Sequence, residues 1–264
     1  MSLQRFYALL FLCLPGMAFA GAWPAPEGVT QYIVTTSLKG EDAGDIAGIL
    51  NDEDARNEIS LYAEHGLTED TTGGLTVYAG FDRAELSYAE VEIGAFLRHR
   101  FWSNEMGDVA SFEFGINLPA ERWIGSDLGA NRDNSVNEAF GSLMYGIGRQ
   151  LDWANVFASS GMEYRARGGG KADEVTLFTT LGVQPHDRFI GLLDIWLQKP
   201  VDGDDPLRLK LTPSVGVILR PWMWENEKKK GQLSYPTTLQ LGMTYDTLNP
   251  EDGVSLNLSI WKSF

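Results

Sequence analysis

Hydrophobic and polar residues alternate along much of this chain, in segments separated by glycine, proline, aspartate or asparagine. Alternation with a period of two predicts β-strands, because successive side chains of a strand point to opposite faces of a sheet. Twelve such segments occur, at residues 29–38, 57–66, 73–82, 88–102, 109–118, 136–148, 153–165, 172–182, 188–199, 206–219, 233–246 and 253–264. Most exceed the roughly 9 to 11 residues that cross a bilayer at a tilt. The pattern predicts an all-β fold, a single antiparallel up-and-down transmembrane β-barrel of about twelve strands.

The segment at residues 88–102 shows the two faces of a strand clearly. Its apolar residues are Ala89, Val91, Ile93, Ala95, Leu97 and Phe101, and they alternate with Glu90, Glu92, Gly94, Arg98 and Arg100. In a membrane barrel the apolar set faces lipid and the polar set faces the lumen. A soluble β-sandwich would show the same alternation, so the assignment to a membrane depends on the two ends of the chain.

Both ends favour export to the outer membrane. Arg5, the apolar run 6–14 and the small residues of Ala18-Phe-Ala20 predict a signal peptide at residues 1–20, cleaved before Gly21. Residues 21–264 would then form the barrel. The alternating residues 254–264 end on Phe264, which we interpret as a closing strand whose terminal phenylalanine is read by the barrel-assembly machinery. Lys262 departs from the pattern, because an aromatic or apolar residue is usual two positions before such a phenylalanine.

Connection lengths give a second indication of orientation. If the first strand runs outward, the connections Gly40–Arg56 and Pro119–Ser135 are extracellular and long, whereas Ser103–Asp108 and Leu151–Asp152 are short periplasmic turns. The connection Arg220–Gly231 is long for a periplasmic turn. This connection contains Lys228-Lys-Lys230, and we interpret it as a misplaced strand, an interfacial turn or a contact for a partner.

Composition narrows the class of protein. The formal net charge of −15 argues against binding nucleic acid through the overall field. The one cysteine, Cys13, lies in the predicted leader, so the exported chain is expected to have no disulfides and no thiolate metal ligands. After the leader, no stretch approaches the roughly 18 apolar residues of a spanning helix.

Two stretches resemble known outer-membrane families. Gly21-Ala-Trp-Pro24, with Gly28 and the strand Gln31-Tyr-Ile-Val34, resembles the start of XagA-like proteins. The stretch Tyr62–Gly74 resembles a strand-turn-strand found in these proteins and in transporter-like barrels of the phenol-degradation type, although His65 stands where those families usually carry tyrosine. The resemblance covers the first two strands and one turn. It implies an outer-membrane barrel with a poorly defined cargo, and it brings no catalytic residues.

Charged residues on the predicted lumen face are the candidate functional residues. Those proposed as lumen or selectivity residues are Glu90, Glu92, Arg98, Arg100, Glu113, Asp194, Arg208 and Lys210. A filled barrel would bury them as paired networks, whereas a water-filled pore would leave them solvated as a selectivity filter. Both readings stay open. The mixed signs argue against a strongly anion-selective sugar-acid channel and leave cations, neutral solutes or a structural plug. Trp196 and Phe178 also point inward by phase and make a weak case for a stacking site.

Enzymatic and metal sites have little support. An outer-membrane phospholipase of the same strand number needs serine and histidine close on one strand, but the neighbours of His99 on its face are Leu97 and Phe101. Acidic clusters in the predicted loops 40–56 and 202–205 match no calcium motif. If these clusters have a function, it would be to hold a metal ion that bridges to lipopolysaccharide phosphates. We predict no catalytic residues, no metal site and no cofactor.

Two functions therefore remain, a passive channel or transporter for small solutes and a non-transporting surface or assembly barrel. In the second, the loops 40–56 and 119–135, or the turn at 228–230, would contact a partner. The expected partners in either case are outer-membrane lipids, lipopolysaccharide and the barrel-assembly machinery at Phe264. The oligomeric state stays open. A soluble periplasmic β-protein is a third possibility.

Overall fold

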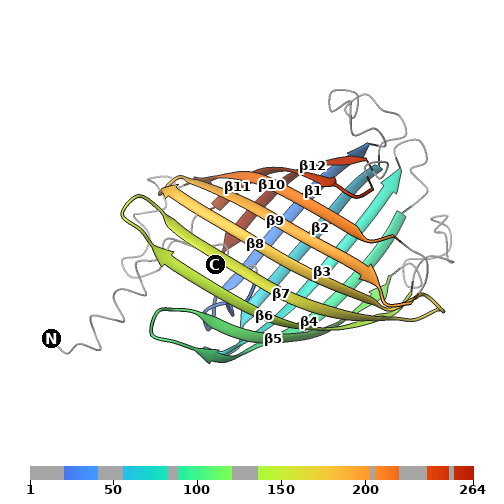
Figure 1. Ribbon diagram of the computed structural model, residues 1–264, viewed down its shortest axis with the longest axis horizontal. Helices are drawn as coiled ribbons and strands as arrows, with labels where there is room; N and C mark the ends of the chain where they lie inside the picture. The colour runs from blue at the N-terminus through green and yellow to red at the C-terminus, as the bar shows by residue number, and fades with distance from the viewer. Residues whose placement is uncertain are drawn as a thin grey trace.

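The computed structural model describes residues 21–40, 56–82, 89–120, 136–202, 206–219, 237–249 and 253–264, with backbone only at residues 82, 89 and 90. Within these residues, twelve antiparallel strands form one closed barrel (Figure 1). They are β1 (Thr30–Gly40), β2 (Arg56–Gly66), β3 (Thr71–Asp82), β4 (Ala89–Ser103), β5 (Val109–Pro119), β6 (Glu138–Gln150), β7 (Asn155–Arg167), β8 (Glu174–His186), β9 (Phe189–Pro200), β10 (Arg208–Leu219), β11 (Thr237–Asp246) and β12 (Val254–Ser263). The predicted fold class is confirmed.

Each strand pairs with the next along the chain, and β1 pairs with β12 to close the ring. In that closing pair Val34 lies opposite Ile260. The pairing continues one residue past the last residue of β12: Phe264 N donates to the Thr30 carbonyl oxygen at 2.8 Å, and Thr30 N donates to the Phe264 carbonyl oxygen at 3.2 Å. The segment predicted to close the barrel therefore does so.

The predicted segments match the observed strands apart from their ends. The largest extension is in β8, which continues to His186 instead of ending at residue 182, because its pairing with β9 goes on through an irregularity between Val183 and His186. The segment predicted at 233–246 is described from Thr237 onward. The long connection at 220–231, with Lys228–Lys230, lies outside the described residues, as do the loops 41–55 and 121–135.

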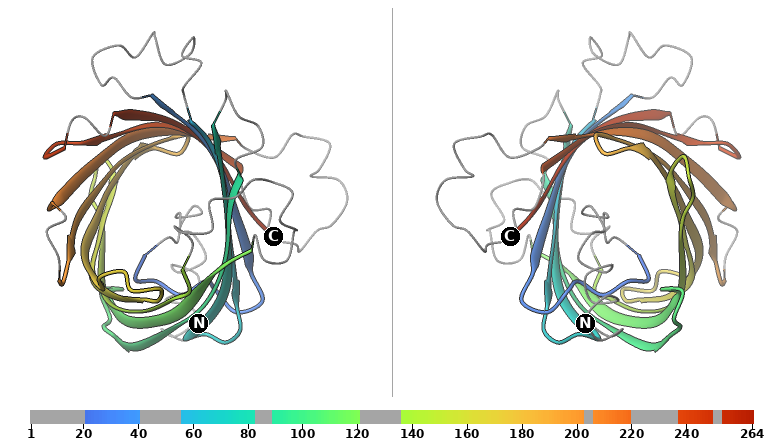
Figure 2. Two further views of the ribbon diagram at one scale, coloured as in Figure 1. Left: turned by 90° about the vertical axis from the view of Figure 1, so that its right-hand side faces the viewer. Right: turned by 90° about the vertical axis from the view of Figure 1, so that its left-hand side faces the viewer.

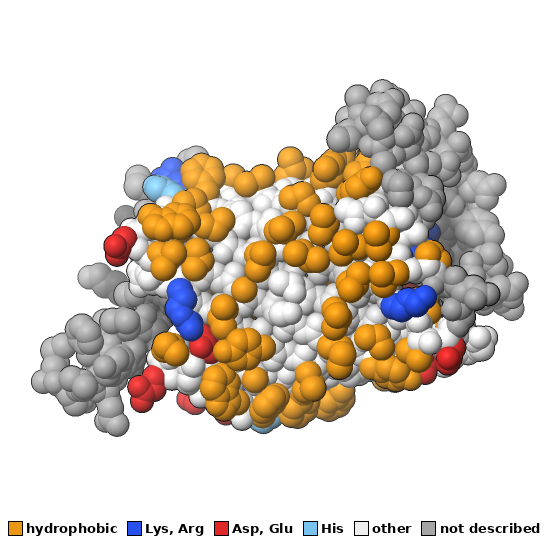
Figure 3. All heavy atoms as spheres, in the orientation of Figure 1, with side chains coloured by type: hydrophobic (Ala, Val, Ile, Leu, Met, Phe, Trp, Pro, Cys, Tyr) orange, Lys and Arg blue, Asp and Glu red, His pale blue; other side chains and the backbone are white. Residues whose placement is uncertain are grey.

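The outer face of the barrel is apolar. Exposed side chains on it include Val34, Leu75, Phe114, Leu143, Val215 and Leu241. On the face shown in Figure 3, hydrophobic side chains spread over the middle of the wall and charged ones lie toward its ends. This is the distribution that a barrel needs in order to sit in hydrocarbon, where every backbone group is paired and outward side chains are apolar. The described residues contain no helix of the length and hydropathy that a membrane span requires.

The inner face combines polar side chains with phenylalanine rings laid over glycines of neighbouring strands. Phe157 in β7 lies opposite Gly182 in β8, where a Cβ would be only 2.0 Å from the ring. The same arrangement recurs where Phe96 covers Gly74, Phe140 covers Gly115 and Phe178 covers Gly161. The glycines leave room for large rings inside a curved wall, so the lumen is partly filled by them.

The two ends of the barrel differ. Short turns at 67–70, 104–108, 151–154 and 187–188 lie at one end, which we call the turn end; β1 starts and β12 finishes there too. The other end, the loop end, carries the connections that follow β1, β3, β5, β7, β9 and β11. This division agrees with the predicted alternation of short and long connections, except for the connection that joins β10 to β11 at the turn end, which spans residues 220–236 and lies outside the described residues.

Candidate functional site

The N-terminal segment, residues 21–28, enters the barrel at the turn end and crosses its interior. Viewed along the barrel in Figure 2, this stretch, coloured blue, lies inside the ring of strands. Ala22 and Ala25 are 0% and 1% exposed. Because Ala22, Pro24 and Ala25 are buried inside the wall and not against its outer face, we call residues 21–28 the plug.

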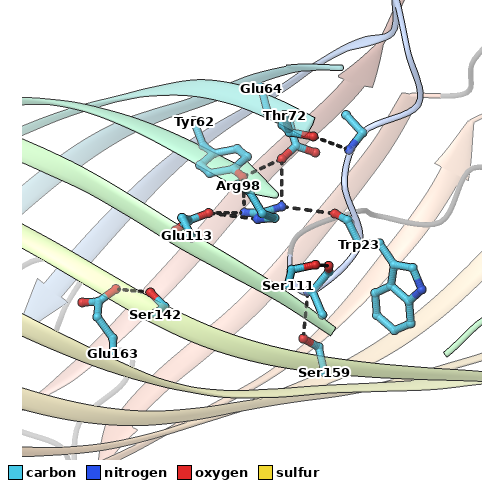
Figure 4. Close-up of polar contacts among 12 residues, drawn as sticks. Trp23, Tyr62, Glu64, Thr72, Arg98, Ser111, Glu113, Ser142, Ser159 and Glu163 are labelled. Carbon is cyan, nitrogen blue, oxygen red and sulfur yellow. Dashed lines mark hydrogen bonds and ion pairs between the residues drawn. The ribbon is translucent and has the colours of Figure 1, made fainter. Parts of the chain in front are cut away.

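Hydroxyl groups from three strands hold the plug backbone (Figure 4). Ala25 N donates to Thr72 Oγ1 of β3 at 2.7 Å, and Ala22 N donates to Ser159 Oγ of β7 at 3.1 Å. Ser111 Oγ of β5 donates to the Ala22 carbonyl oxygen. These contacts satisfy buried backbone groups that would otherwise lose their water without replacement. The plug therefore reaches from β3 to β7 across the lumen.

Trp23 supplies the apolar part of the plug. Its ring meets Phe157 edge to face, with centroids 6.5 Å apart, and packs against a cluster of Phe157, Ile190 and Leu192. Its Nε1 donates to the Gly107 carbonyl oxygen at 3.3 Å. Gly146 makes room for the indole, since a Cβ there would lie 2.8 Å from the ring. Trp23 thus packs inside the barrel, and its indole N–H has a hydrogen-bond partner there.

The plug then turns into β1 through a short bridge to β2. Glu27 pairs with Gly66, and Gly28 N donates to the Gly66 carbonyl oxygen at 2.8 Å. Gly28 has a φ of +76°, a backbone conformation that glycine adopts without strain. A Cβ on Gly66 would lie 2.0 Å from the Pro26 carbonyl oxygen, so this glycine is needed for the close approach.

Behind the plug lies a buried ionic cluster centred on Arg98 of β4. Its guanidinium contacts Glu64 Oε2 at 3.3 Å and Glu113 Oε2 at 2.8 Å, and it donates to the Tyr62 hydroxyl at 3.0 Å. The Tyr62 hydroxyl in turn donates to Glu64 Oε2 at 2.6 Å. The side chains of Arg98, Glu64 and Glu113 are 5%, 0% and 13% exposed. Pairing with Arg98 offsets part of the cost of burying these carboxylates, although Glu64 Oε1 is buried without a hydrogen-bond partner.

Arg98 also contacts the plug directly. Its Nη1 donates to the Trp23 carbonyl oxygen at 3.2 Å. Tyr62 stacks on Phe96, with centroids 5.4 Å apart, and the guanidinium lies 5.4 Å from the centroid of the same Phe96 ring. The cluster, the ring and the plug backbone therefore pack as one unit at the turn end.

The predicted lumen residues fall into separate places. Arg98 and Glu113 meet in the buried cluster. Arg100 instead pairs with Asp70 of the turn 67–70, with Nε 2.7 Å from Oδ1. Asp194, in the middle of β9, accepts a hydrogen bond from Thr180 of β8. The side chain of Glu90 lies outside the described residues. The remaining three, Glu92, Arg208 and Lys210, each make a polar or electrostatic contact, and their part in selectivity remains a prediction.

A polar cavity of about 310 Å³ occupies the lumen toward the loop end. It is lined by Glu163, Arg165, Glu174, Thr176, Trp196, Gln198, Lys210, Thr212 and Thr244. Arg165 bridges two carboxylates, with Nη2 2.7 Å from Glu163 Oε1 and Nη1 2.9 Å from Glu138 Oε2. The barrel interior thus holds the plug at its turn end and a hydrophilic cavity toward its loop end.

Sequence reasoning identified Arg98 and Glu113 but missed the plug and the residues that hold it. The alternation places Tyr62 on the inward face of its strand, but its aromatic ring does not mark it as a partner of buried charges. Thr72, Ser111 and Ser159 are ordinary inward hydroxyls in the sequence. The available signal was the short apolar stretch Ala22–Ala25, which precedes the first strand and lacks the alternation that would place it in the lipid-facing wall.

No catalytic or metal arrangement is evident among the described residues. His99 Nδ1 is 3.0 Å from Thr71 Oγ1, and its ring packs against Phe112. The described residues contain no group of three or more histidine, cysteine or acidic side chains placed to hold a metal ion. The predicted acidic cluster between residues 41 and 54 lies outside the described part of the chain.

Comparisons with known proteins support the fold. No protein-family model and no curated protein matches the sequence. Among solved structures, the KdgM porin aligns with a TM-score of 0.52 at 7% identity, covering 89% of this chain and 99% of that one. The COG4313 outer membrane channel from Pseudomonas putida F1 aligns with a TM-score of 0.52 at 14% identity, covering 94% and 99%. LpxR from Salmonella typhimurium aligns with a TM-score of 0.50 at 10% identity, covering 88% and 99%.

Identities this low show similarity of fold alone. The class that fold and site define is a closed twelve-stranded barrel, of the architecture found in outer-membrane proteins, whose lumen holds its own N-terminal segment. The finer resemblance to XagA-like proteins and to barrels of the phenol-degradation type stays a prediction.

Proposed function

We propose that this protein is a passive outer-membrane channel for small solutes, narrowed at its turn end by the plug. The observation that carries this proposal is the hydrophilic cavity of about 310 Å³ inside a wall whose outer face is apolar. A barrel that served only as an anchor has no need of a solvated interior lined by charges and hydroxyls. Two of the structures with this fold are described as a porin and as an outer membrane channel, which is consistent with the proposal.

The plug sets the size limit of the proposed channel. Its backbone is held at Ala22 and Ala25, and the Trp23 ring occupies the space beside Phe157. A solute that enters at the loop end meets the polar cavity first and the plug last. Permeation would therefore be restricted to small solutes, and displacement of the plug would widen the path.

A non-transporting surface or assembly barrel is the alternative. The feature that favours it is the tight hold on the plug, since hydroxyls from three strands and the buried Arg98 bind the segment. If the plug never moves and leaves no path beside it, the lumen is a filled core. The two functions differ in one measurable property, the passage of ions.

Single-channel recording in planar bilayers tests the proposal. Refolded residues 21–264 would be compared with a variant that lacks residues 22–25 and with Trp153→Ser, a control in an exposed turn at the same end. We expect small stable current steps from the wild type and from Trp153→Ser, and larger steps from the deletion. A silent wild type, with its folding verified by heat-modifiable migration on gels, contradicts the channel. If only the deletion then conducts, the surface-anchor alternative is favoured.

A further inference from the structure

We propose that the loop-end cavity is a binding subsite for a neutral, polyhydroxylated ring of monosaccharide size. This deepens the channel proposal by giving it a substrate class. The subsite consists of one aromatic face, a set of hydroxyl and amide groups, and charges that neutralise one another within the wall. Each of these three features favours such a ligand.

Trp196 of β9 provides the aromatic face. Its side chain points into the lumen and lines the cavity, yet the residue is 45% exposed. Phe178 of β8 supports it, with centroids 5.6 Å apart and ring planes inclined by 31°. Phe178 is itself held over Gly161, where a Cβ would lie 2.4 Å from the ring. A supported indole face exposed to solvent in a polar lumen suits the C–H face of a sugar ring, because aromatic faces carry partial negative charge.

Hydroxyl and amide groups surround this face. Thr212 Oγ1 and Thr244 Oγ1 are 2.9 Å apart, and Asn257 Nδ2 donates to Thr244 Oγ1 at 2.8 Å. Thr176 and Gln198 line the same cavity. Hydroxyls both donate and accept hydrogen bonds, and an amide offers both kinds of group. Such a set matches a ligand whose own hydroxyls do the same.

The arginines and glutamates beside the cavity are already paired with one another. Arg165 contacts Glu163 and Glu138, and Arg167 Nη1 is 3.5 Å from Glu174 Oε2. Lys210 also has a polar or electrostatic contact. A charged ligand would have to break these pairs and leave a partner unsatisfied, which is costly in a narrow lumen. A neutral ligand leaves them intact.

The volume limits the ligand to a single ring. At about 310 Å³ the cavity is at the small end of the roughly 300–1,000 Å³ typical of ligand sites. One hexose-sized molecule fits this space together with some water, whereas an extended oligomer would have to reach beyond it. The subsite therefore recognises one sugar unit at a time.

Equilibrium binding of D-glucose to the refolded full barrel in detergent tests the inference. Saturation-transfer NMR would follow the wild type, Trp196→Ala, Trp196→Phe and the control Trp153→Ala, in the exposed turn at the opposite end. We expect Trp196→Ala to weaken binding by about tenfold, Trp196→Phe to weaken it less, and Trp153→Ala to leave it unchanged. Heat-modifiable migration verifies that each variant is folded, and the phenylalanine variant keeps a ring in place if the alanine variant does not fold.

Three results overturn the subsite: no glucose binding by the folded wild type, equal binding by Trp196→Ala, or a preference for benzoate or tetramethylammonium as charged probes. The test is independent of conductance. Glucose binding by a barrel that passes no current supports the subsite and contradicts the channel. Conduction without glucose binding supports the channel and contradicts the subsite.

Discussion

Arg98 Nη1 donates a hydrogen bond to the backbone carbonyl oxygen of Trp23, across 3.2 Å, and so joins the barrel wall to the plug. The same guanidinium is the cation shared by the carboxylates of Glu64 and Glu113, whose side chains are 0% and 13% exposed. Arg98 therefore stabilises the barrel wall and also holds the plug backbone in place. Changes at Arg98 are expected to affect both properties together.

Replacement of Arg98 by methionine is expected to lower the free energy of unfolding by about 3–5 kcal/mol, since it leaves two buried carboxylates without their cation. Urea unfolding followed by tryptophan fluorescence measures this loss. Arg56→Met is the matched control. The pair of Arg56 with Glu58 is partly exposed, with fractions of 35% and 26%, and Arg56 also donates to the Tyr78 hydroxyl at 3.1 Å, so we expect a smaller loss of about 1–2 kcal/mol. Equal losses in the two variants would contradict the assigned role of the cluster.

Plug seating is expected to loosen in the same Arg98→Met variant. The sequence has one cysteine, Cys13 in the predicted leader, so Ala25→Cys introduces a single thiol into residues 21–264. Ala25 is buried, and we expect this thiol to react slowly with a maleimide in the wild-type background and faster beside Arg98→Met. Unchanged reactivity would mean that the hydroxyl contacts hold the plug without Arg98.

Gly182→Ala is expected to destabilise the barrel by about 1–3 kcal/mol, as an overpacked site does. The added Cβ would lie 2.0 Å from the Phe157 ring, which must then move against Trp23. Gly148→Ala is the control, since a Cβ there meets nothing within 4 Å, and we expect a change within about 0.5 kcal/mol. Thermal unfolding of the two variants gives the comparison, and similar melting temperatures would refute the packing argument.

The pH dependence of stability should reflect Asp108, in the turn 104–108. Hydrogen bonds from Arg149 and then from Asn104 hold the pKa of Asp108 below its usual value, with Arg149 Nη2 and Asn104 Nδ2 at 3.0 and 2.9 Å from Oδ2. A depressed carboxyl pKa stabilises the fold at pH values above the unfolded pKa of about 3.9, and the contribution is lost as pH falls through the folded value.

Melting temperatures of Asp108→Asn and the wild type should therefore differ at pH 7 and converge as the pH falls below the lowered pKa of folded Asp108. Asp152→Asn, in the exposed neighbouring turn 151–154, is the matched control for the loss of one turn carboxylate, and its melting temperature at pH 7 should be close to that of the wild type. A difference between Asp108→Asn and the wild type that persists unchanged in acid would show that the aspartate acts through shape and not through charge.

Ion selectivity should respond in opposite directions to two lumen substitutions. Asp194→Asn removes a negative charge from the middle of β9 and is expected to shift the reversal potential in a salt gradient toward anions. Lys210→Gln removes a positive charge beside the polar cavity and is expected to shift it toward cations, because fixed charges in a narrow lumen set the local ion concentrations. Reversal potentials that stay unchanged in both variants would place these residues away from the ion path.

The strands are predictable from the sequence because a barrel places alternate residues against lipid on the outside and in the polar lumen on the inside. In β4, Phe101 outside and Arg98 inside follow directly from that period. The plug was not predictable in this way, since residues 21–28 have no period and its contacts depend on which strands close around it. Three-dimensional closure brings Ala22 within reach of Ser159, far along the chain, and no local pattern encodes such a contact.

The charges show the same division between local pattern and tertiary context. The inward phase placed Arg98, Arg100 and Asp194 on one face of their strands, but it could not distinguish a buried partner from a solvated one. Arg100 is close to the end of β4 and pairs with Asp70 in a turn, whereas Arg98, two residues earlier, is enclosed by the plug. Depth along the barrel and the presence of the plug decide between these outcomes.

The pairing of β1 with β12 has a consequence for biogenesis. Until Val254–Ser263 arrive, the sheet has two open edges with unpaired backbone groups, and each is a template for another strand. The contacts that remove both edges join the most distant parts of the sequence, so they form late and at high entropic cost. A product truncated before β12 is therefore expected to keep its open edges and to bind chaperones or be degraded by proteases. It is not expected to close into a barrel of eleven strands.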